Sequence, residues 1–169
     1  MSADIFGRAD RLAAITQSIG FTLWQIQELE GCAAQYIVLL TQATPGMGTE
    51  AGLALIDKAL SKTFGHTIHQ LAKAGLLSEE LERRFMALLN ERNWLVHKSR
   101  GENRDAIHGD AAAQRLLDRL GAMECESKAL LNQIGSLAEK HVLGAGITRR
   151  RIDELTGLLL ERWHTGADS

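Results

Sequence analysis

Residues 110–141 read DAAAQRLLDRLGAMECESKALLNQIGSLAEKH and contain the longest helical pattern in the chain. The apolar side chains of this segment recur mostly at alternating steps of three and four residues: Leu116, Leu120, Met123, Leu130, Ile134 and Leu137. Such spacing places one apolar stripe along a helix, as in the seam of a coiled coil. Ser127 stands within the seam, and we expect it to interrupt the pattern. Because a single amphipathic helix cannot bury its stripe alone, the segment predicts a bundle of helices.

The rest of the chain repeats this helical pattern between short polar breaks. Gly20 is expected to separate the first two helices, and Thr49, Ser78 and Thr148 are expected to cap later ones. The expected helices cover about residues 4–19, 22–41, 49–60, 65–73, 78–98, 110–141 and 148–163. Charged residues 99–108 are expected to form a loop. We predict an all-α antiparallel bundle in a single domain, residues 1–169, whose last helix (about 147–164) can pack as an appendage.

Composition narrows the classes of function. The chain has 169 residues and a formal net charge of −2, so it lacks a fold-wide basic field and any nucleic-acid contact needs a local patch. Cys32 and Cys125 lack metal-ligand spacing and are expected to be reduced. The first residues do not resemble a signal peptide, and no apolar run has the length of a membrane span. We therefore expect a cytoplasmic protein with no membrane partner.

The segment Glu91-Arg92-Asn93-Trp94-Leu95-Val96-His97 holds the richest chemistry in the sequence. At about 100° per residue, Arg92 falls about 20° from Leu81, inside the apolar arc of its helix. A cation there is costly unless it is paired or faces a ligand. Asn93 and His97 are four residues apart and share another face, about 120° to 160° round. One helix therefore does not bring Arg92 and His97 together, and a twofold dimer is one arrangement that can.

Each of these residues also has a purely structural interpretation. Arg92 can pair with a core carboxylate such as Glu28 or Glu30. His97 can be a helix C-terminal residue favoured by the macrodipole, and Asn93 can cap or bridge locally.

Arg92-Asn93-Trp94-Leu95-Val96-His97 resembles the Arg-polar-x-x-x-His motif of HEPN domains, small all-α domains found in many prokaryotic ribonuclease toxins and defence proteins. The order of the expected helices is also similar. Members with this motif are typically homodimers that cut RNA without a metal. The resemblance implies that His97 acts as general acid or base on the ribose 2′-hydroxyl or the leaving oxygen. It also implies that Arg92 binds the scissile phosphate and that Asn93 orients either group.

Basic residues outside the motif are weaker candidates. Lys98, Arg100 and Arg104 follow it and predict either a nucleic-acid-binding patch or an ordinary solvated loop. The run Arg149–Arg151 opens the last expected helix and favours a surface role, since cations are unfavourable at a helix start.

Metal ligands and aromatic anchors complete the list. His66 and His69 are three apart, but no third ligand stands near them, so we predict no metal and no cofactor. Trp24, Trp94 and Trp163 are expected to anchor the core or an interface.

The resemblance thus implies a metal-independent endoribonuclease of toxin or defence type, acting on RNA as a homodimer. The alternative is a non-catalytic HEPN-like module that binds nucleotide, RNA, a nucleotidyltransferase or an antitoxin. A third hypothesis is a helical scaffold in which Arg92 only forms a salt bridge.

Overall fold

The computed structural model describes residues 2–44 and 46–166, and it describes side chains for all of these except residues 2–6, 162 and 163. Every element in this part of the chain is helical, which confirms the all-α prediction. The elements are α1 (Ser2–Thr41), α2 (Thr49–Leu60), α3 (Phe64–Lys73), α4 (Glu79–His97), α5 (Ser99–Glu102), the 3₁₀ helix η1 (Arg104–Ile107), α6 (Asp110–Gly144) and α7 (Arg149–Thr165). They form two compact units, Met1–Ile134 and Gly135–Ser169.

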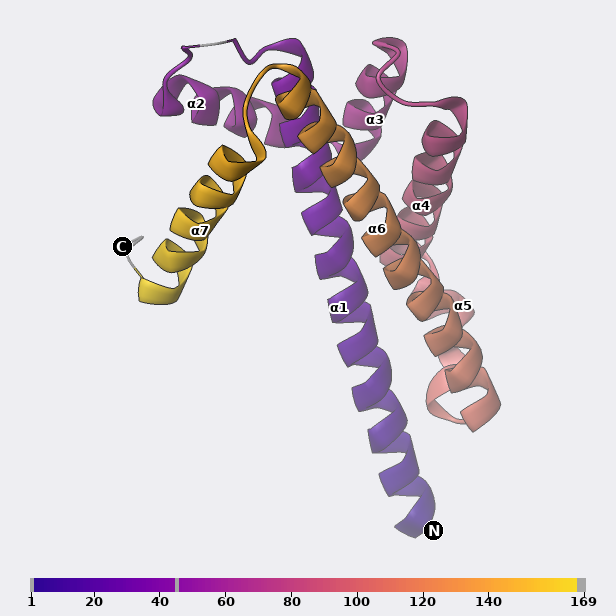
Figure 1. Ribbon diagram of the computed structural model, residues 1–169. Helices are drawn as coiled ribbons and strands as arrows, with labels where there is room; N and C mark the ends of the chain where they lie inside the picture. The colour runs from indigo at the N-terminus through magenta and orange to yellow at the C-terminus, as the bar shows by residue number, and fades with distance from the viewer. Residues whose placement is uncertain (1, 45, 167–169) are drawn as a thin grey trace. The chain divides into compact units, whose positions relative to one another are not determined.

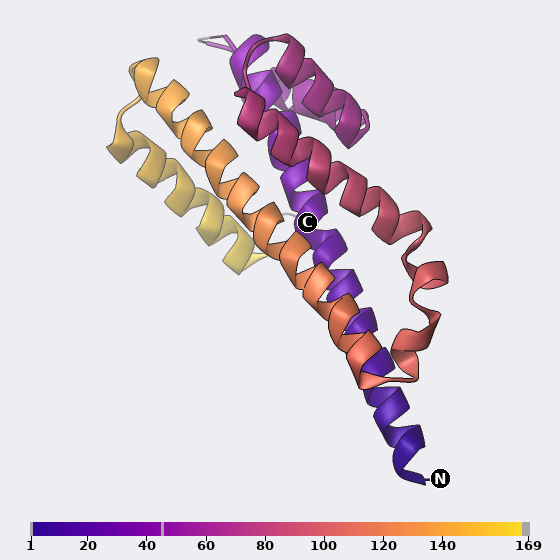
Figure 2. The same ribbon diagram turned by 90° about the vertical axis from the view of Figure 1, so that its right-hand side faces the viewer.

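Three long helices organise the first unit (Figures 1 and 2). Arg11 donates to Asp110, and eleven residues later Thr22 donates to Glu124, so α1 and α6 run parallel. α4 runs antiparallel to α6, because its early residue Arg84 bonds Glu126 and its later residue Glu91 bonds Arg119.

The short helices α2 and α3 connect α1 to α4, and both contact α1. The unit is therefore an up-down-up arrangement of α1, α4 and α6, with α3 packed at one end of α4.

The apolar stripes of α1, α3, α4 and α6 form most of the core, as the helical periodicity predicts. The Phe64 ring of α3 meets the Phe85 ring of α4 edge-on, with centroids 6.1 Å apart and planes at 78°. Buried core residues include Ile26, Leu29, Ala33, Ile68, Leu71, Leu81, Leu88, Leu95, Leu116, Leu120, Met123, Leu130 and Ile134.

Two expected interruptions are absent. Gly20 lies inside the 40-residue helix α1, so the prediction of two separate helices was wrong. One glycine costs a helix only about 1 kcal/mol, which packing of the remaining stripe offsets. Ser127 is buried within α6, and its hydroxyl donates to the Met123 carbonyl oxygen one turn earlier, so the helix continues through it.

Other local predictions have mixed outcomes. Ser78 caps α4 by accepting from the Leu81 N–H at 3.2 Å, and Thr148 accepts from the Arg151 N–H at 3.3 Å, as expected. Gly48, not Thr49, is the N-cap residue of α2. The expected loop over residues 99–108 instead forms α5 and η1, stabilised in part by the Asn103 amide, which donates to the Ser99 carbonyl oxygen at 2.8 Å.

The second unit consists of the end of α6 and the amphipathic helix α7. Gly146 joins the two helices with a φ of 90°, a backbone conformation that glycine adopts without strain. Within the unit, Arg149 pairs with Glu139, and Arg150 and Arg151 both pair with Glu154. These pairs match the surface role favoured for the three arginines. The Trp163 side chain lies outside the described residues.

Within the described part of the chain, none of the helices combines the length and the apolar character that crossing a bilayer requires.

Candidate functional site

α4 is buried on two sides and open on a third. Leu81, Phe85, Leu88 and Leu95 face the core, and Trp94, about 140° away, is buried against α6. The remaining arc holds Met86, Asn90, Asn93, Val96 and His97, all exposed. Val96 is 48 % exposed because it stands at the edge of the apolar arc. Trp94 is therefore buried, as expected for a residue that anchors the core.

A polar cluster fixes the Trp94 side of α4. The guanidinium of Arg119 stacks on the Trp94 ring, with Cζ 3.3 Å from the ring centroid. The same guanidinium donates to both carboxylate oxygens of Glu91, at 2.7 and 2.9 Å. The indole N–H of Trp94 donates to Glu102 at 2.6 Å. These contacts hold α4 in one rotation about its axis, which sets where Arg92, Asn93 and His97 point.

Arg92 pairs with Glu30 of α1, one of the two carboxylates that the sequence suggested for it. Arg92 Nε lies 3.4 Å from Glu30 Oε1, an ion-pair distance but long for a hydrogen bond. No described side chain donates to Glu30 Oε1, although this oxygen atom is buried. Burial raises the pKa of Glu30, and the charge and the N–H groups of nearby Arg92 oppose that rise. The pair is thus loose and incompletely satisfied.

Arg92, Asn93 and Glu30 border a common cavity of about 430 Å³. Arg92 Nη1 donates to Asn93 Oδ1 at a long 3.5 Å. The other lining residues are Lys62, Thr63, Phe64, Gly65 and Leu89. Asn93, Lys62 and Thr63 are exposed, so the cavity opens to solvent.

The start of α3 forms one wall of this cavity. Thr63 caps the helix by accepting from the His66 N–H at 3.3 Å, which leaves N–H groups of the first turn as potential donors to an anion. A Cβ at Gly65 would lie 3.1 Å from Leu89 Cδ2, so the glycine allows α3 to approach α4 closely.

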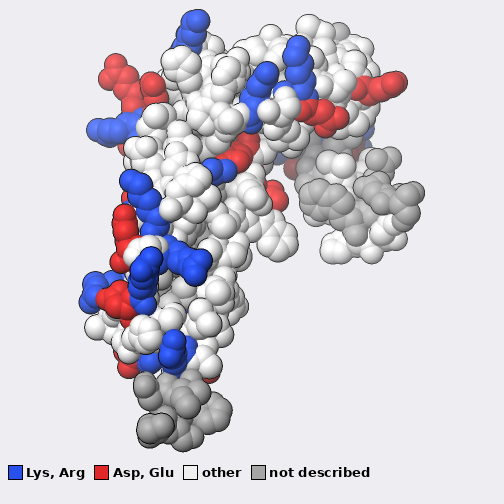
Figure 3. All heavy atoms as spheres, turned by 180° about the vertical axis from the view of Figure 1, so that it is seen from behind, with Lys and Arg blue, Asp and Glu red and all other residues white. Residues whose placement is uncertain are grey.

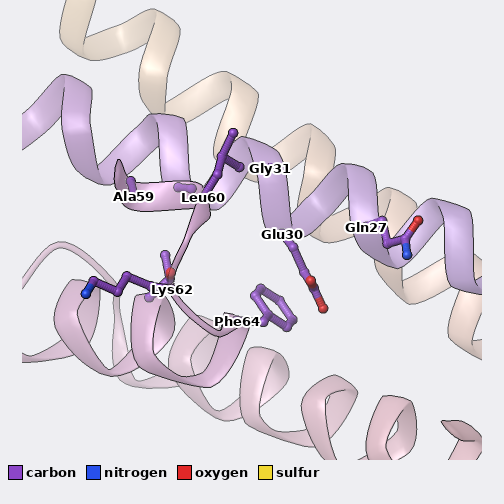
Figure 4. Close-up of a pocket in the computed structure, with 9 residues that line it drawn as sticks. Gln27, Glu30, Gly31, Ala59, Leu60, Lys62 and Phe64 are labelled. Carbon is purple, nitrogen blue, oxygen red and sulfur yellow. The ribbon is translucent and has the colours of Figure 1, made fainter. Parts of the chain in front are cut away.

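A second, smaller cavity of about 120 Å³ lies beside the first and shares Glu30, Lys62 and Phe64 with it. Figure 4 shows the Glu30 carboxylate beside the Phe64 ring, whereas the Lys62 side chain extends away from Glu30.

His97 is exposed and is not among the residues that line these cavities. It follows Asn93 by one helical turn, a spacing that places the two Cβ atoms about 5–6 Å apart. The structure therefore brings Arg92 and Asn93 together in a cavity and leaves His97 on the open arc just beyond it.

The other predicted nucleic-acid residues do not gather at this cavity. Lys98, Arg100 and Arg104 are all exposed. Arg100 borders a different, mainly apolar cavity of about 330 Å³ between α1, α5, η1 and α6. On the face drawn in Figure 3, Lys and Arg side chains are interspersed with Asp and Glu, without a broad basic surface.

His66 and His69 are both exposed, and among the described residues no three potential metal ligands come together.

The sequence did not indicate that Lys62, Thr63 and Gly65 belong to the candidate site. A Thr at the start of a helical pattern predicts an N-cap, but only the tertiary fold shows that this cap faces Arg92.

Comparison of the chain with models of protein families, with curated proteins and with solved structures finds no match.

Proposed function

We propose that the protein is a metal-independent endoribonuclease of the HEPN type, active as a homodimer. Arg92 binds the scissile phosphate through its guanidinium, and Asn93 orients the phosphate or the imidazole. His97 acts as general acid or base, the catalytic role that a histidine side chain most often takes.

In this reaction the ribose 2′-oxygen attacks phosphorus and loses its proton, while the 5′-oxygen leaves and gains one. The products carry a 2′,3′-cyclic phosphate and a 5′-hydroxyl. RNA is the substrate class because the reaction consumes a 2′-hydroxyl.

One observation carries the proposal: the open arc of α4 combines the candidate chemistry with exposed apolar side chains. Met86 is 42 % exposed and Val96 48 %, and they share this arc with Asn93 and His97. Apolar residues grouped with polar ones on an open helix face suit self-association. A twofold axis near Asn93 would place two copies of His97 and Arg92 around one cleft.

His97→Ala tests the chemistry. We expect RNA cleavage in the presence of EDTA to fall by about a hundredfold or more, since proton transfer typically contributes that much. The free energy of unfolding should stay within about 0.5 kcal/mol of wild type because the side chain is exposed.

His108→Ala, which removes another exposed histidine, is the matched control and should cleave normally. Equal cleavage by the two variants would remove His97 from the mechanism.

A second candidate function follows from the Glu30–Arg92 pair, which partly neutralises the guanidinium, and from the place of His97 outside the cavity. Here the chain is a non-catalytic module that binds RNA or nucleotide, or that partners a nucleotidyltransferase or an antitoxin. In each of these forms the wild-type protein does not cut RNA, and in the RNA-binding form it binds RNA with an affinity that His97→Ala leaves unchanged.

A further inference from the structure

The cavity that Arg100 borders is lined mainly by apolar side chains and shares no lining residue with the cavity beside Arg92. Its volume is about 330 Å³, and it lies between α1, α5, η1 and α6. A water molecule in such a space needs two to four polar partners, and walls of this kind offer few. The cavity therefore suits an apolar group better than water. Its apolar lining residues are Leu12, Ile15, Ile19, Ala106, Ile107 and Leu116.

Specific contacts hold the walls of this cavity in place. Arg11 of α1 donates from Nε to the Ile107 carbonyl oxygen at 3.1 Å and from Nη1 to Asp110 at 2.7 Å. The Ser99 hydroxyl, which is buried, donates to the Leu95 carbonyl oxygen of α4 at 2.6 Å. The segment of α5 and η1, which links α4 to α6 in Figure 2, is thus tied to long helices at both ends. The cavity is therefore formed by packed elements, as ligand sites usually are.

The polar lining residues offer hydrogen-bond donors and one positive charge. Arg100 is exposed, and within the part of the chain that the structure describes it forms no ion pair. One N–H of the Asn103 side-chain amide donates to the Ser99 carbonyl oxygen, which leaves the other N–H for a ligand. The hydroxyls of Thr16 and Ser99 already donate to carbonyl oxygens one turn earlier. No acidic side chain is among the described lining residues, so the cavity does not repel an anion.

We propose that this cavity binds a small amphipathic carboxylate, such as a short-chain or medium-chain fatty acid. The apolar tail occupies the cavity, while the carboxylate pairs with Arg100 and accepts a hydrogen bond from Asn103. The inference does not depend on the proposed ribonuclease, because none of the lining residues belongs to the candidate site on α4.

Charge and volume favour this ligand over other small molecules. A nucleotide would leave its sugar and base hydrogen-bonding groups without partners against apolar walls, and a cation would be repelled by Arg100. A wholly apolar molecule would fill the cavity but would leave Arg100 without a counterion. The volume of about 330 Å³ falls within the range of about 300–1,000 Å³ that is typical of small-molecule sites.

Calorimetric titration with straight-chain carboxylates from butanoate to decanoate, each below its micelle concentration, tests the ligand class. We expect the affinity to rise about fourfold for each added methylene group while the tail still enters the cavity, and to level off once the cavity is full. Octanol and octylamine carry the same tail with a neutral or a positive head group. Both should bind about tenfold or more weakly than octanoate, because only the carboxylate forms charge-assisted hydrogen bonds with Arg100.

Variants of the polar edge test where the carboxylate binds. Arg100→Ala should remove the preference for octanoate over octanol, while the dependence on tail length remains. Arg104→Ala removes another exposed arginine of the same segment, one that does not line the cavity. It is the matched control and should bind both ligands as wild type does.

A second kind of variant tests whether the tail enters the cavity. Thr16 lines the cavity and is exposed, so Thr16→Trp should obstruct the cavity and abolish binding of every carboxylate without unfolding the protein. Circular dichroism checks the folding of each variant. If Thr16→Trp does not fold, Leu12→Glu replaces it, since a carboxylate at this half-exposed lining residue should also prevent binding.

Three outcomes would overturn the proposal. Wild type that binds neither octanoate nor decanoate has no such site. Equal affinity for octanoate and octanol, or a preference that survives at Arg100→Ala, shows that Arg100 does not receive the carboxylate. A change from dimer to monomer in the sedimentation of Thr16→Trp, without carboxylate binding by wild type, shows that a second copy of the chain covers the cavity instead.

Discussion

Arg92 occupies a position where the apolar pattern of α4 suits a leucine, and its surroundings explain why a cation is tolerated there. The side chain is 34 % exposed, so its charge is partly hydrated, and Glu30 supplies an opposite charge at 3.4 Å. A loose pair of this kind contributes little to stability and can exchange its partner for a phosphate. A side chain that only stabilised the core would more readily be apolar.

The raised pKa of Glu30 predicts a pH dependence of folding. The folded protein holds this proton to higher pH than the unfolded chain does, whose glutamate titrates near 4.5. The stability contributed by protonated Glu30 is therefore present below that value and is lost as the pH rises toward the raised pKa of the folded state. Glu30→Gln, which cannot ionise, should become more stable relative to wild type across this window and level off above it.

Urea denaturation at a series of pH values measures this difference. Glu28→Gln removes an exposed carboxylate of the same helix and controls for the change in net charge. If the stability difference for Glu30→Gln follows the trend seen at Glu28→Gln, burial of Glu30 does not control its ionisation.

At single residues, sequence reasoning reached some contacts and missed others for a physical reason. It suggested Glu30 as a partner of Arg92, because a cation in an apolar arc needs a carboxylate on a facing helix. It could not choose between Glu28 and Glu30, since that depends on the rotation of α1 against α4. It also missed Lys62 and Thr63, because their proximity to Arg92 depends on how the α2–α3 connection folds back.

Among the elements, α4 determines the candidate site because its neighbours fix its rotation. Helical periodicity predicts which side of α4 faces the core. The packing of the Trp94 side depends instead on a contact with Arg119 of α6. Sequence reasoning also failed at Gly20 and Ser127. Both were expected to interrupt helices, yet Gly20 lies within α1 and Ser127 within α6. Local propensities of about 1 kcal/mol decide little when a helix has a long stripe to bury.

Arg119→Leu should loosen α4 from α6. It removes the stacking on Trp94 and the bidentate pair with Glu91. Because the Arg119 side chain is 41 % exposed, solvent screens the pair, and we expect a loss of about 1–2 kcal/mol in the free energy of unfolding.

Arg115→Leu is the matched control on the same helix, since Arg115 is 71 % exposed and lies 3.9 Å from Asp105. It should change stability by less than about 0.5 kcal/mol in a urea denaturation experiment. Equal losses for the two variants would show that the Trp94 cluster does not anchor α4.

For the whole molecule, net charge and surface charge argue against binding RNA through a broad electrostatic field. The chain carries −2 overall, and both signs are mixed on the face in Figure 3. The RNA recognition that we propose would then come from a small site with defined contacts, and the affinity for RNA should depend only modestly on salt. A small site on one protomer also leaves His97 uncovered, so the proposed chemistry needs a second copy to exclude water.

Met86→Glu and Val96→Glu together test that requirement, because they place two carboxylates among the exposed apolar residues of the α4 arc. Both positions are already exposed, so the fold should be retained. Two copies that meet through this arc would bring four like charges together, which opposes association by several kcal/mol. We expect the variant to sediment as a monomer and to lose RNA cleavage. Leu53→Glu, at a residue of α2 that is 55 % exposed, should leave both properties unchanged. A monomeric double variant that still cuts RNA would show that one protomer suffices, and a dimeric one would place the interface elsewhere.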